Sequence, residues 1–209
     1  SPYFITNQDK MTSDLDRPYI LICNKKIAQL KELMPILEKV LNAQRSILIV
    51  ADDVDGEAMQ GLVVNTLRGA LKVCAVRSPG FGESRVDILN DLATLAGAKV
   101  FSEVSGDKLE DLTFEDLGVC KKAIVGKTST VLVGCEGEQK EIESRANRAY
   151  VRINIGRKNR IKNEQECKVF RRIRKNAKGS NGQIISSIEF DKNGLLRLFR
   201  VQEDFSWGK

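Results

Sequence analysis

Hydrophobic positions along the chain alternate between short continuous runs and longer stretches in which they recur every three or four residues. Short runs rich in β-branched residues indicate buried strands, whereas the three-to-four spacing indicates helices that bury one side. The runs predict strands at residues 18–23, 47–51, 71–76 and 100–101, and a hairpin from residues 123–125 and 131–133. The spacing predicts helices at residues 25–41, 57–68 and 84–96. Strands that alternate with helices indicate an α/β domain.

Local signals refine the ends of these elements. Pro35 falls inside the first predicted helix, so it either kinks that helix or marks the first turn of a shorter one. Gly97 follows the third helix at the position where a left-handed residue commonly ends a helix. The stretch from Thr113 to Asp116 resembles a capping box, and it predicts one helical turn.

The stretch Ile47–Gly69 predicts a buried strand, an acidic turn and a helix that is unusually apolar. Its apolar residues occupy more of the helix surface than one buried stripe requires: Met59, Leu62, Val63, Val64 and Leu67. Either the helix is buried on two sides, or part of this surface is offered to something outside the domain.

The acidic turn itself suggests a second hypothesis. Asp52, Asp53, Asp55 and Glu57 follow a predicted strand, and carboxylate oxygens are ligands that magnesium prefers. A metal-dependent enzyme is therefore one interpretation. We favour the simpler one, in which these carboxylates cap the following helix and favour the positive end of its dipole.

Composition excludes several classes of chemistry. The chain has no histidine, which removes the commonest general base and the commonest metal ligand. Its five cysteines are Cys23, Cys74, Cys120, Cys135 and Cys167, and no two of them have the spacing of a zinc or thioredoxin-like motif. Widely scattered cysteines in odd number are typical of a reducing compartment.

The net charge of +6 conceals a strong division along the chain. Residues 1–144 carry 17 Lys+Arg against 22 Asp+Glu, a balance of −5, whereas residues 145–209 carry 17 against 6, a balance of +11. The basic residues 148–178 suggest a nucleic-acid-binding protein, an alternative from another functional class. No recognisable binding motif or set of stacking aromatic residues accompanies the charge. Further on, residues 183–201 form a β-hairpin pattern with Asn193-Gly194 at the turn.

Six segments of the first 145 residues resemble the apical domain of the group I chaperonins, the GroEL family, in the same order and with similar spacing. The segments are S-P-Y-F-I-T-N from Ser1, P-Y-I-L-I-C-N-K-K-I from Pro18, E-L-M-P-I-L-E-K-V from Glu32, D-G-E-A-M-Q-G-L-V-V-N-T-L-R-G from Asp55, L-K-V-C-A-V-R-S-P-G-F-G from Leu71 and L-E-D-L-T-F-E-D-L-G from Leu109. Each motif is of moderate specificity, and their combination is very specific.

The resemblance implies a fold and a binding site. It implies an α/β apical domain over residues 1–145, with a β-sandwich core flanked by helices and two parallel-lying helices that form an exposed apolar groove. Residues 146–209 would be a divergent basic region with a possible hairpin at 183–201. In the family this groove, with an underlying extended segment, binds non-native polypeptides and a GroES-type co-chaperonin. The matching polypeptide-binding residues here are Tyr3, Phe4, Met34, Leu37, Met59, Val63, Val64 and Asn65.

The chain also departs from the family pattern. Met34 and Met59 replace the usual leucines, and Gln60-Gly61 replaces a common Ala-Thr. A glycine inside a helix costs roughly 1 kcal/mol relative to alanine. The basic residues that usually follow the Pro-Gly-Phe-Gly turn are also missing.

The resemblance further implies a module of a larger machine. The parent chaperonin would be an ATPase that forms homo-oligomeric rings, with ATP and magnesium bound by an equatorial domain that this sequence lacks. We therefore expect no enzymatic activity, cofactor or metal in this chain, and a monomeric fragment or diverged paralogue. No membrane partner is expected. The compartment would be bacterial cytoplasm, mitochondrial matrix or plastid stroma.

Overall fold

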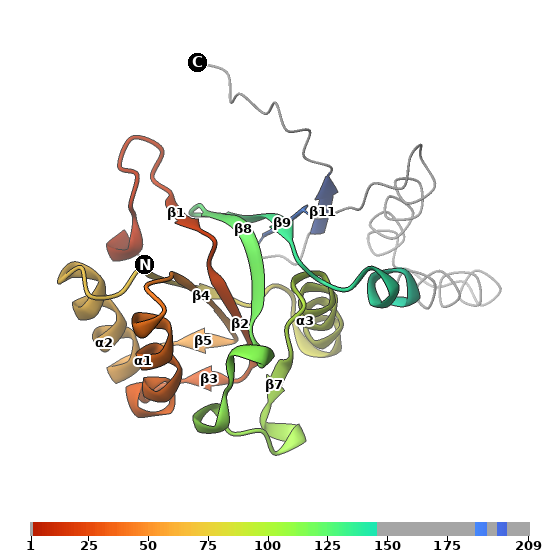
Figure 1. The fold of residues 1–209 in the computed structure, drawn as a ribbon, viewed down its shortest axis with the longest axis horizontal. Coiled ribbons are helices and arrows are strands. Elements are labelled where there is room, and N and C mark those ends of the chain that lie inside the picture. The colour runs from red at the N-terminus through yellow and green to blue at the C-terminus, as the bar shows by residue number, and fades with distance from the viewer. Residues whose placement is uncertain (1, 146–186, 192–195, 200–209) are drawn as a thin grey trace.

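A computed structural model describes residues 2–145, 187–191 and 196–199 of the chain (Figure 1). The basic residues 148–178 and the predicted Asn193-Gly194 turn lie outside the described residues.

A group of parallel strands forms one half of the main sheet. β2 (Tyr19–Asn24) lies between β4 (Ile47–Ala51) and β7 (Val100–Ser102), and β6 (Val73–Arg77) follows β4. All five residues of β4 are buried. A continuous apolar run is what a parallel strand covered on both faces requires.

Antiparallel strands form the other half of the sheet. β8 (Gly118–Val125) pairs with β1 (Ser13–Asp16) and with β9 (Ser129–Cys135). The start of β8 also pairs with β2, so the two halves share this strand and make one nine-stranded, nearly closed sheet. The structure is therefore mixed α/β, as the sequence predicts. The finer expectation, a chaperonin-like β-sandwich, stays a prediction.

The C-terminal hairpin predicted from the sequence extends the same sheet. β10 (Ser187–Asp191) and β11 (Leu196–Phe199) pair with each other in antiparallel orientation, and β10 also pairs with β9. Ile188 lies opposite Leu132 in that second pair. The hairpin therefore adds two strands to the sheet built by residues 1–145.

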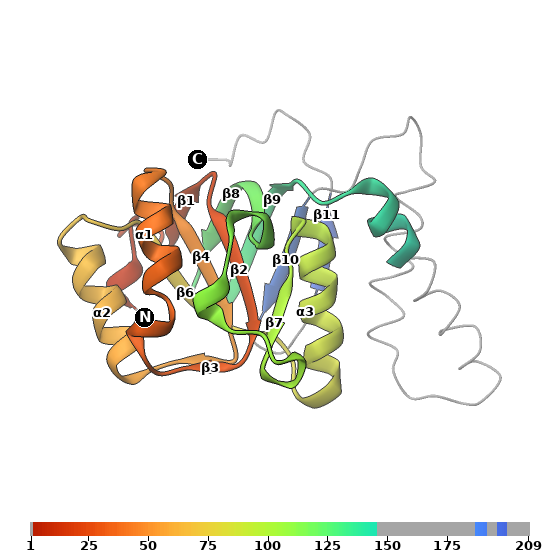
Figure 2. The ribbon, with the colours of Figure 1, turned by 60° about the horizontal axis from the view of Figure 1, so that its bottom comes forward.

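Three helices flank the parallel strands. α1 (Met34–Asn42) and α2 (Gly56–Leu67) lie on one side, and α3 (Gly82–Ala96) lies on the other, as both overall views show (Figures 1 and 2). Among the described residues there are also five short 3-10 turns: η1 (Pro2–Phe4), η2 (Leu30–Glu32), η3 (Glu103–Ser105), η4 (Leu109–Asp111) and η5 (Phe114–Asp116). No helix in the described part of the chain is long and apolar enough to cross a membrane.

The single helix predicted over residues 25–41 is wrong. Its first part is the short strand β3 (Lys26–Ile27), which pairs in parallel with β5 (Asp53–Val54), and η2 follows. Helix α1 begins only at Met34, with Pro35 in its first turn, where a missing N–H costs nothing. The buried Ile27 satisfies the helical spacing but fills the core from a strand.

The other local predictions are confirmed. Gly97 ends α3 with φ of 71°, the left-handed region that glycine adopts readily. Thr113 and Asp116 form a capping box around η5, in which Thr113 Oγ1 donates to Asp116 Oδ2 at 2.7 Å. The hairpin predicted from residues 123–133 is the β8–β9 pair.

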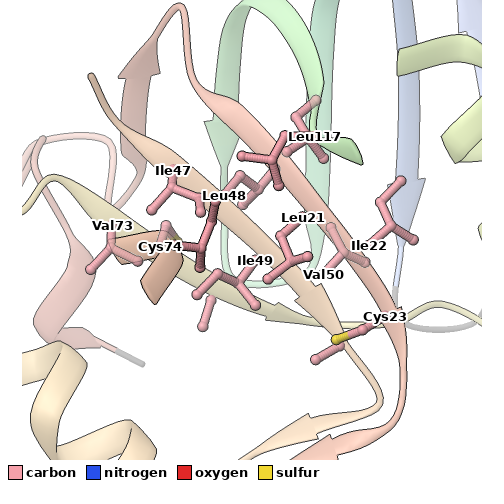
Figure 3. Packing of buried hydrophobic residues seen from close by; sticks show 14 of the residues in the cluster. Leu21, Ile22, Cys23, Ile47, Leu48, Ile49, Val50, Val73, Cys74 and Leu117 are labelled. Carbon is pink, nitrogen blue, oxygen red and sulfur yellow. The ribbon is translucent and has the colours of Figure 1, made fainter. Parts of the chain in front are cut away.

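The core lies between the sheet and the flanking helices. Side chains of β2, β4 and β6 pack together, and Leu117 closes one end of the group (Figure 3). α1 contributes Ile36, Leu37 and Val40 to the same cluster. This packing holds α1 and α2 on one face of the sheet.

Candidate functional site

Five of the ten exposed large apolar side chains in the described part of the chain lie on η1, α1 and α2, one of them, Leu41, near the end of α1. Tyr3 of η1 is 60% exposed, Met34 of α1 is 40% exposed, and Val64 and Leu67 of α2 are 43% and 67% exposed. We call these four residues the candidate face. α2 contacts both η1 and η2, and α1 contacts η2. In both overall views α1 and α2 lie side by side, close to the N-terminus (Figures 1 and 2).

α1 exposes some of its apolar side chains and buries others. Met34 and Leu41 are exposed, whereas Leu37 is only 3% exposed and belongs to the core. Lys39 anchors the helix, since its Nζ donates to the carbonyl of Leu112 at 2.7 Å. In this conformation Leu37 therefore offers no surface to a ligand, although the resemblance places it among the binding residues.

The apolar residues of α2 range from buried to exposed. Ala58 and Leu62 are buried, while Met59 and Val63 are half-buried and pack against the core cluster. Val64 is exposed beside them. The excess of apolar surface noted in the sequence thus has both predicted causes: the helix is buried over a wide arc, and part of it remains open.

Gly61 lets η2 approach α2 closely. A Cβ at Gly61 would lie 2.4 Å from Leu30 Cδ2, far inside van der Waals contact. Two residues correspond to about 200° around a helix. Met59 and Val63, each two residues from Gly61, therefore lie on the flank of α2 opposite Leu30.

Asn65 and the N-terminal turn are placed differently from the expectation. Asn65 Nδ2 donates to the carbonyl of Gly61 at 2.8 Å, so this amide group is engaged within its own helix. The segment expected to be extended is the 3-10 turn η1, in which Tyr3 is exposed and Phe4 is buried in the core. A buried phenylalanine ring anchors the turn, which leaves Tyr3 as its only candidate contact residue among those predicted.

The acidic turn is held by ion pairs, and the side-chain cap expected for α2 is absent, whereas Glu57 lies in the first turn of the helix as expected. Asp55 is the N-cap residue of α2 but makes no side-chain cap hydrogen bond. It pairs instead with Lys26 at 2.5 Å, while Asp53 pairs with Arg77 at 2.9 Å and Asp52 pairs with Arg85. The hydrogen bond from Arg77 lowers the pKa of the Asp53 carboxyl below its usual value. Among the described residues, no group of three or more potential ligands is placed to hold a metal ion.

The described thiols are poor nucleophiles. Burial raises the pKa of Cys23 and Cys120 to about 12 and that of Cys74 to about 11. Only a thiolate attacks efficiently, and at neutral pH these groups are almost entirely protonated. The described residues therefore support a binding surface better than a site of covalent catalysis.

Two exposed residues, Leu67 and Leu41, lie outside the set that the resemblance assigns to polypeptide binding, although Leu67 belongs to the excess apolar surface that the sequence predicts for its helix. Leu67 follows Val64 by three residues and is the most exposed member of the candidate face. Leu41 is also exposed, near the end of α1. The spacing from Val64 to Leu67 could have identified Leu67, because residues three apart are neighbours on a helix surface.

A search against models of known protein families finds no match to this chain.

Proposed function

We propose that this chain is a polypeptide-binding module of the chaperonin apical-domain kind. It would bind non-native polypeptides and a GroES-type co-chaperonin, as part of ATP-dependent protein folding by a parent chaperonin. The observation that carries the proposal is the candidate face: Tyr3, Met34, Val64 and Leu67 are exposed on η1, α1 and α2, where α2 contacts η1 and both helices contact η2. The sequence resemblance independently assigns three of these four residues to polypeptide binding.

The chemistry of the candidate face suits an unselective ligand site. Apolar burial is non-directional, and the flexible thioether of Met34 can repack around different partners. Covering roughly 300 Å² of apolar surface contributes on the order of 8 kcal/mol before the costs of association. Those costs leave a weak, micromolar or weaker complex for a single copy. Linking several copies in a ring would raise the overall avidity.

The direct test places a charge on the candidate face. Val64→Glu would force a carboxylate into the apolar contact, and burying an unpaired charge costs several kcal/mol. We expect the variant to bind a fluorescently labelled amphipathic peptide of roughly 12 residues at least 100-fold more weakly than the parent chain. Fluorescence anisotropy measures this affinity. The peptide with its sequence scrambled to abolish amphipathicity serves as the ligand control.

A matched variant separates the site from a general effect of charge. Thr128→Glu adds the same charge at an exposed position in the β8–β9 turn, outside the candidate face. Its peptide affinity should equal that of the parent chain. If Val64→Glu remains folded by circular dichroism and binds the peptide as tightly as Thr128→Glu, the proposed site is wrong.

A further inference from the structure

Two cysteines lie directly opposite each other at one end of the β8–β9 pair. The register of the two antiparallel strands sets Cys120 against Cys135. Residues directly opposite in an antiparallel pair have Cα atoms about 4.5 or 5.5 Å apart, and their side chains lie on the same face. Both separations fall within the range of roughly 4.4–6.8 Å that a disulfide requires. Both thiols are free in the structure.

The charge of Cys120 also affects the ionisation of Cys135. Cys120 Sγ donates to the carbonyl of Lys122 at 3.3 Å. Burial raises the pKa of Cys135, and the negative charge of an ionised Cys120 raises it further. Gly134, directly before Cys135, has φ of 66°, a conformation that glycine adopts with little strain. This left-handed residue interrupts the regular β geometry of β9 directly before Cys135.

We propose that Cys120 and Cys135 form a redox modification site, which low-molecular-weight disulfides such as oxidised glutathione convert to an intramolecular cross-strand disulfide. This inference is independent of the proposed polypeptide binding, because neither cysteine belongs to the candidate face. The two other described cysteines, Cys23 and Cys74, are buried on β2 and β6, away from this pair.

The reaction proceeds by two thiol–disulfide exchanges. Cys135 is half-buried while Cys120 is fully buried, so Cys135 reacts first. Its thiol loses a proton and attacks one sulfur of oxidised glutathione; the S–S bond breaks, and one glutathione leaves as a thiolate that takes up a proton. Cys120 then loses its proton and attacks the Cys135 sulfur of the mixed disulfide, which releases the second glutathione. The protein dithiol is oxidised, and one glutathione disulfide is reduced to two thiols.

Burial makes this a slow reaction at neutral pH. It raises the pKa of Cys120 to about 12, and it raises the pKa of Cys135 as well. The thiolate fraction, and with it the rate of the first exchange, should rise about tenfold per pH unit between pH 7 and 9. Reduction of the buried disulfide is slowed by the same restricted access.

The disulfide would hold in place the segment that directly follows β9. Directly after Cys135, the N–H of Glu136 donates to the carbonyl of Val119, and the N–H of Gly137 donates to the carbonyl of Leu95 in α3. Oxidation would therefore tie together the end of β9, the shared strand β8 and the segment that packs against α3. We expect the oxidised chain to melt at a higher temperature than the reduced chain.

The experiment uses the full chain under native conditions. The reduced chain is incubated with oxidised glutathione at pH 8.5, free thiols are alkylated, and the sample is digested with trypsin without reduction. Cleavage after Lys121 or Lys127 separates the two cysteines, so a peptide pair joined through Cys120 and Cys135 reports the disulfide by mass spectrometry. Two released glutathiones per chain are expected, together with an increase in melting temperature that dithiothreitol reverses.

Matched variants identify the pair. Cys135→Ser should yield no cross-linked peptide and should leave Cys120 unmodified, whereas Cys74→Ser should behave as the parent chain does. Three results would overturn the proposal: a mixed disulfide that persists at Cys135, a cross-link of either cysteine to another residue, or a pair that stays fully reduced. Because the parent chain itself gives the decisive spectrum, a variant that fails to fold does not affect the result.

Discussion

Gly61→Ala should reveal how closely η2 packs against α2. In an exposed helix interior, replacing glycine with alanine stabilises a protein by roughly 1 kcal/mol, because alanine loses less conformational entropy on folding. At Gly61 the new methyl group would lie 2.4 Å from Leu30 Cδ2 and 3.0 Å from Leu30 Cδ1. The side chain of Leu30 must therefore move, and it is half-buried against the core.

The magnitude follows from setting the two effects against each other. Overpacking a well-filled site costs typically 1–3 kcal/mol, which exceeds the propensity gain of roughly 1 kcal/mol. We expect Gly61→Ala to lower the free energy of unfolding by about 1 kcal/mol. In a Leu30→Ala background the obstructing atoms are gone, so the same substitution should raise that free energy by about 1 kcal/mol. The sign of the effect should reverse, with a coupling energy near 2 kcal/mol.

Urea unfolding followed by circular dichroism on the four chains of this cycle measures the effect. The Leu30→Ala chain provides the control, since it reports the loss of the leucine contacts alone. The explanation fails if Gly61→Ala stabilises the parent chain as much as it stabilises the Leu30→Ala chain. That result would mean that Leu30 moves aside at no cost, and that Gly61 does not set the spacing between η2 and α2.

Two further predictions concern backbone packing and acid stability. Gly137→Ala should lower the free energy of unfolding by about 3 kcal/mol, because its Cβ would lie 2.1 Å from the carbonyl oxygen of Thr94. That oxygen belongs to the backbone, which cannot move aside as a side chain can. Urea unfolding measures the loss of stability, and an unchanged midpoint would contradict this close packing. The lowered pKa of Asp53 means that its ion pair with Arg77 contributes stability above the unfolded-state pKa near 3.8 and loses it as the pH falls through the folded-state value. Arg77→Gln should therefore reduce the loss of stability between pH 5 and pH 3, as measured by urea midpoints at the two pH values; an equal loss in both chains would refute this.

Elements whose signals are local were predictable from the sequence. The apolar run Ile47–Ala51 forms β4, Gly97 ends α3, and Thr113 with Asp116 caps η5, each as expected. In all three cases the residues that determine the structure lie within a few positions of one another. Local energetics and the final fold agree there, so one sequence is sufficient to find them.

Elements that depend on distant partners were not predictable in the same way. Ile27 fits a helical pattern, but it pairs with Val54 in a parallel strand pair that no periodicity could reveal. Asp53 and Asp55 were interpreted as caps because their partners, Arg77 and Lys26, are distant in the sequence. Tertiary contacts therefore overrode the local preference at both places.

The candidate face was predictable only in part, for a related reason. Spacing on α1 places Met34, Leu37 and Leu41 on the same side of the helix, yet Leu37 is buried and the other two are exposed. Which part of an apolar stripe remains open depends on the elements that cover it, here η2 and η4, which also contact α1. Hydrophobic spacing identifies a buried or binding helix without separating the two roles.

The pairing of β10 with β9 has a consequence for the order in which the chain is synthesised. Ile188 pairs with Leu132, so β9 leaves the ribosome long before the strand that covers its edge. Until then the edge of β9 presents backbone N–H and C=O groups that another chain could pair with. Such non-local pairing forms slowly and leaves an aggregation-prone intermediate. A nascent chain of this protein is therefore most vulnerable to edge-to-edge association during the interval between completion of residue 135 and arrival of residue 187.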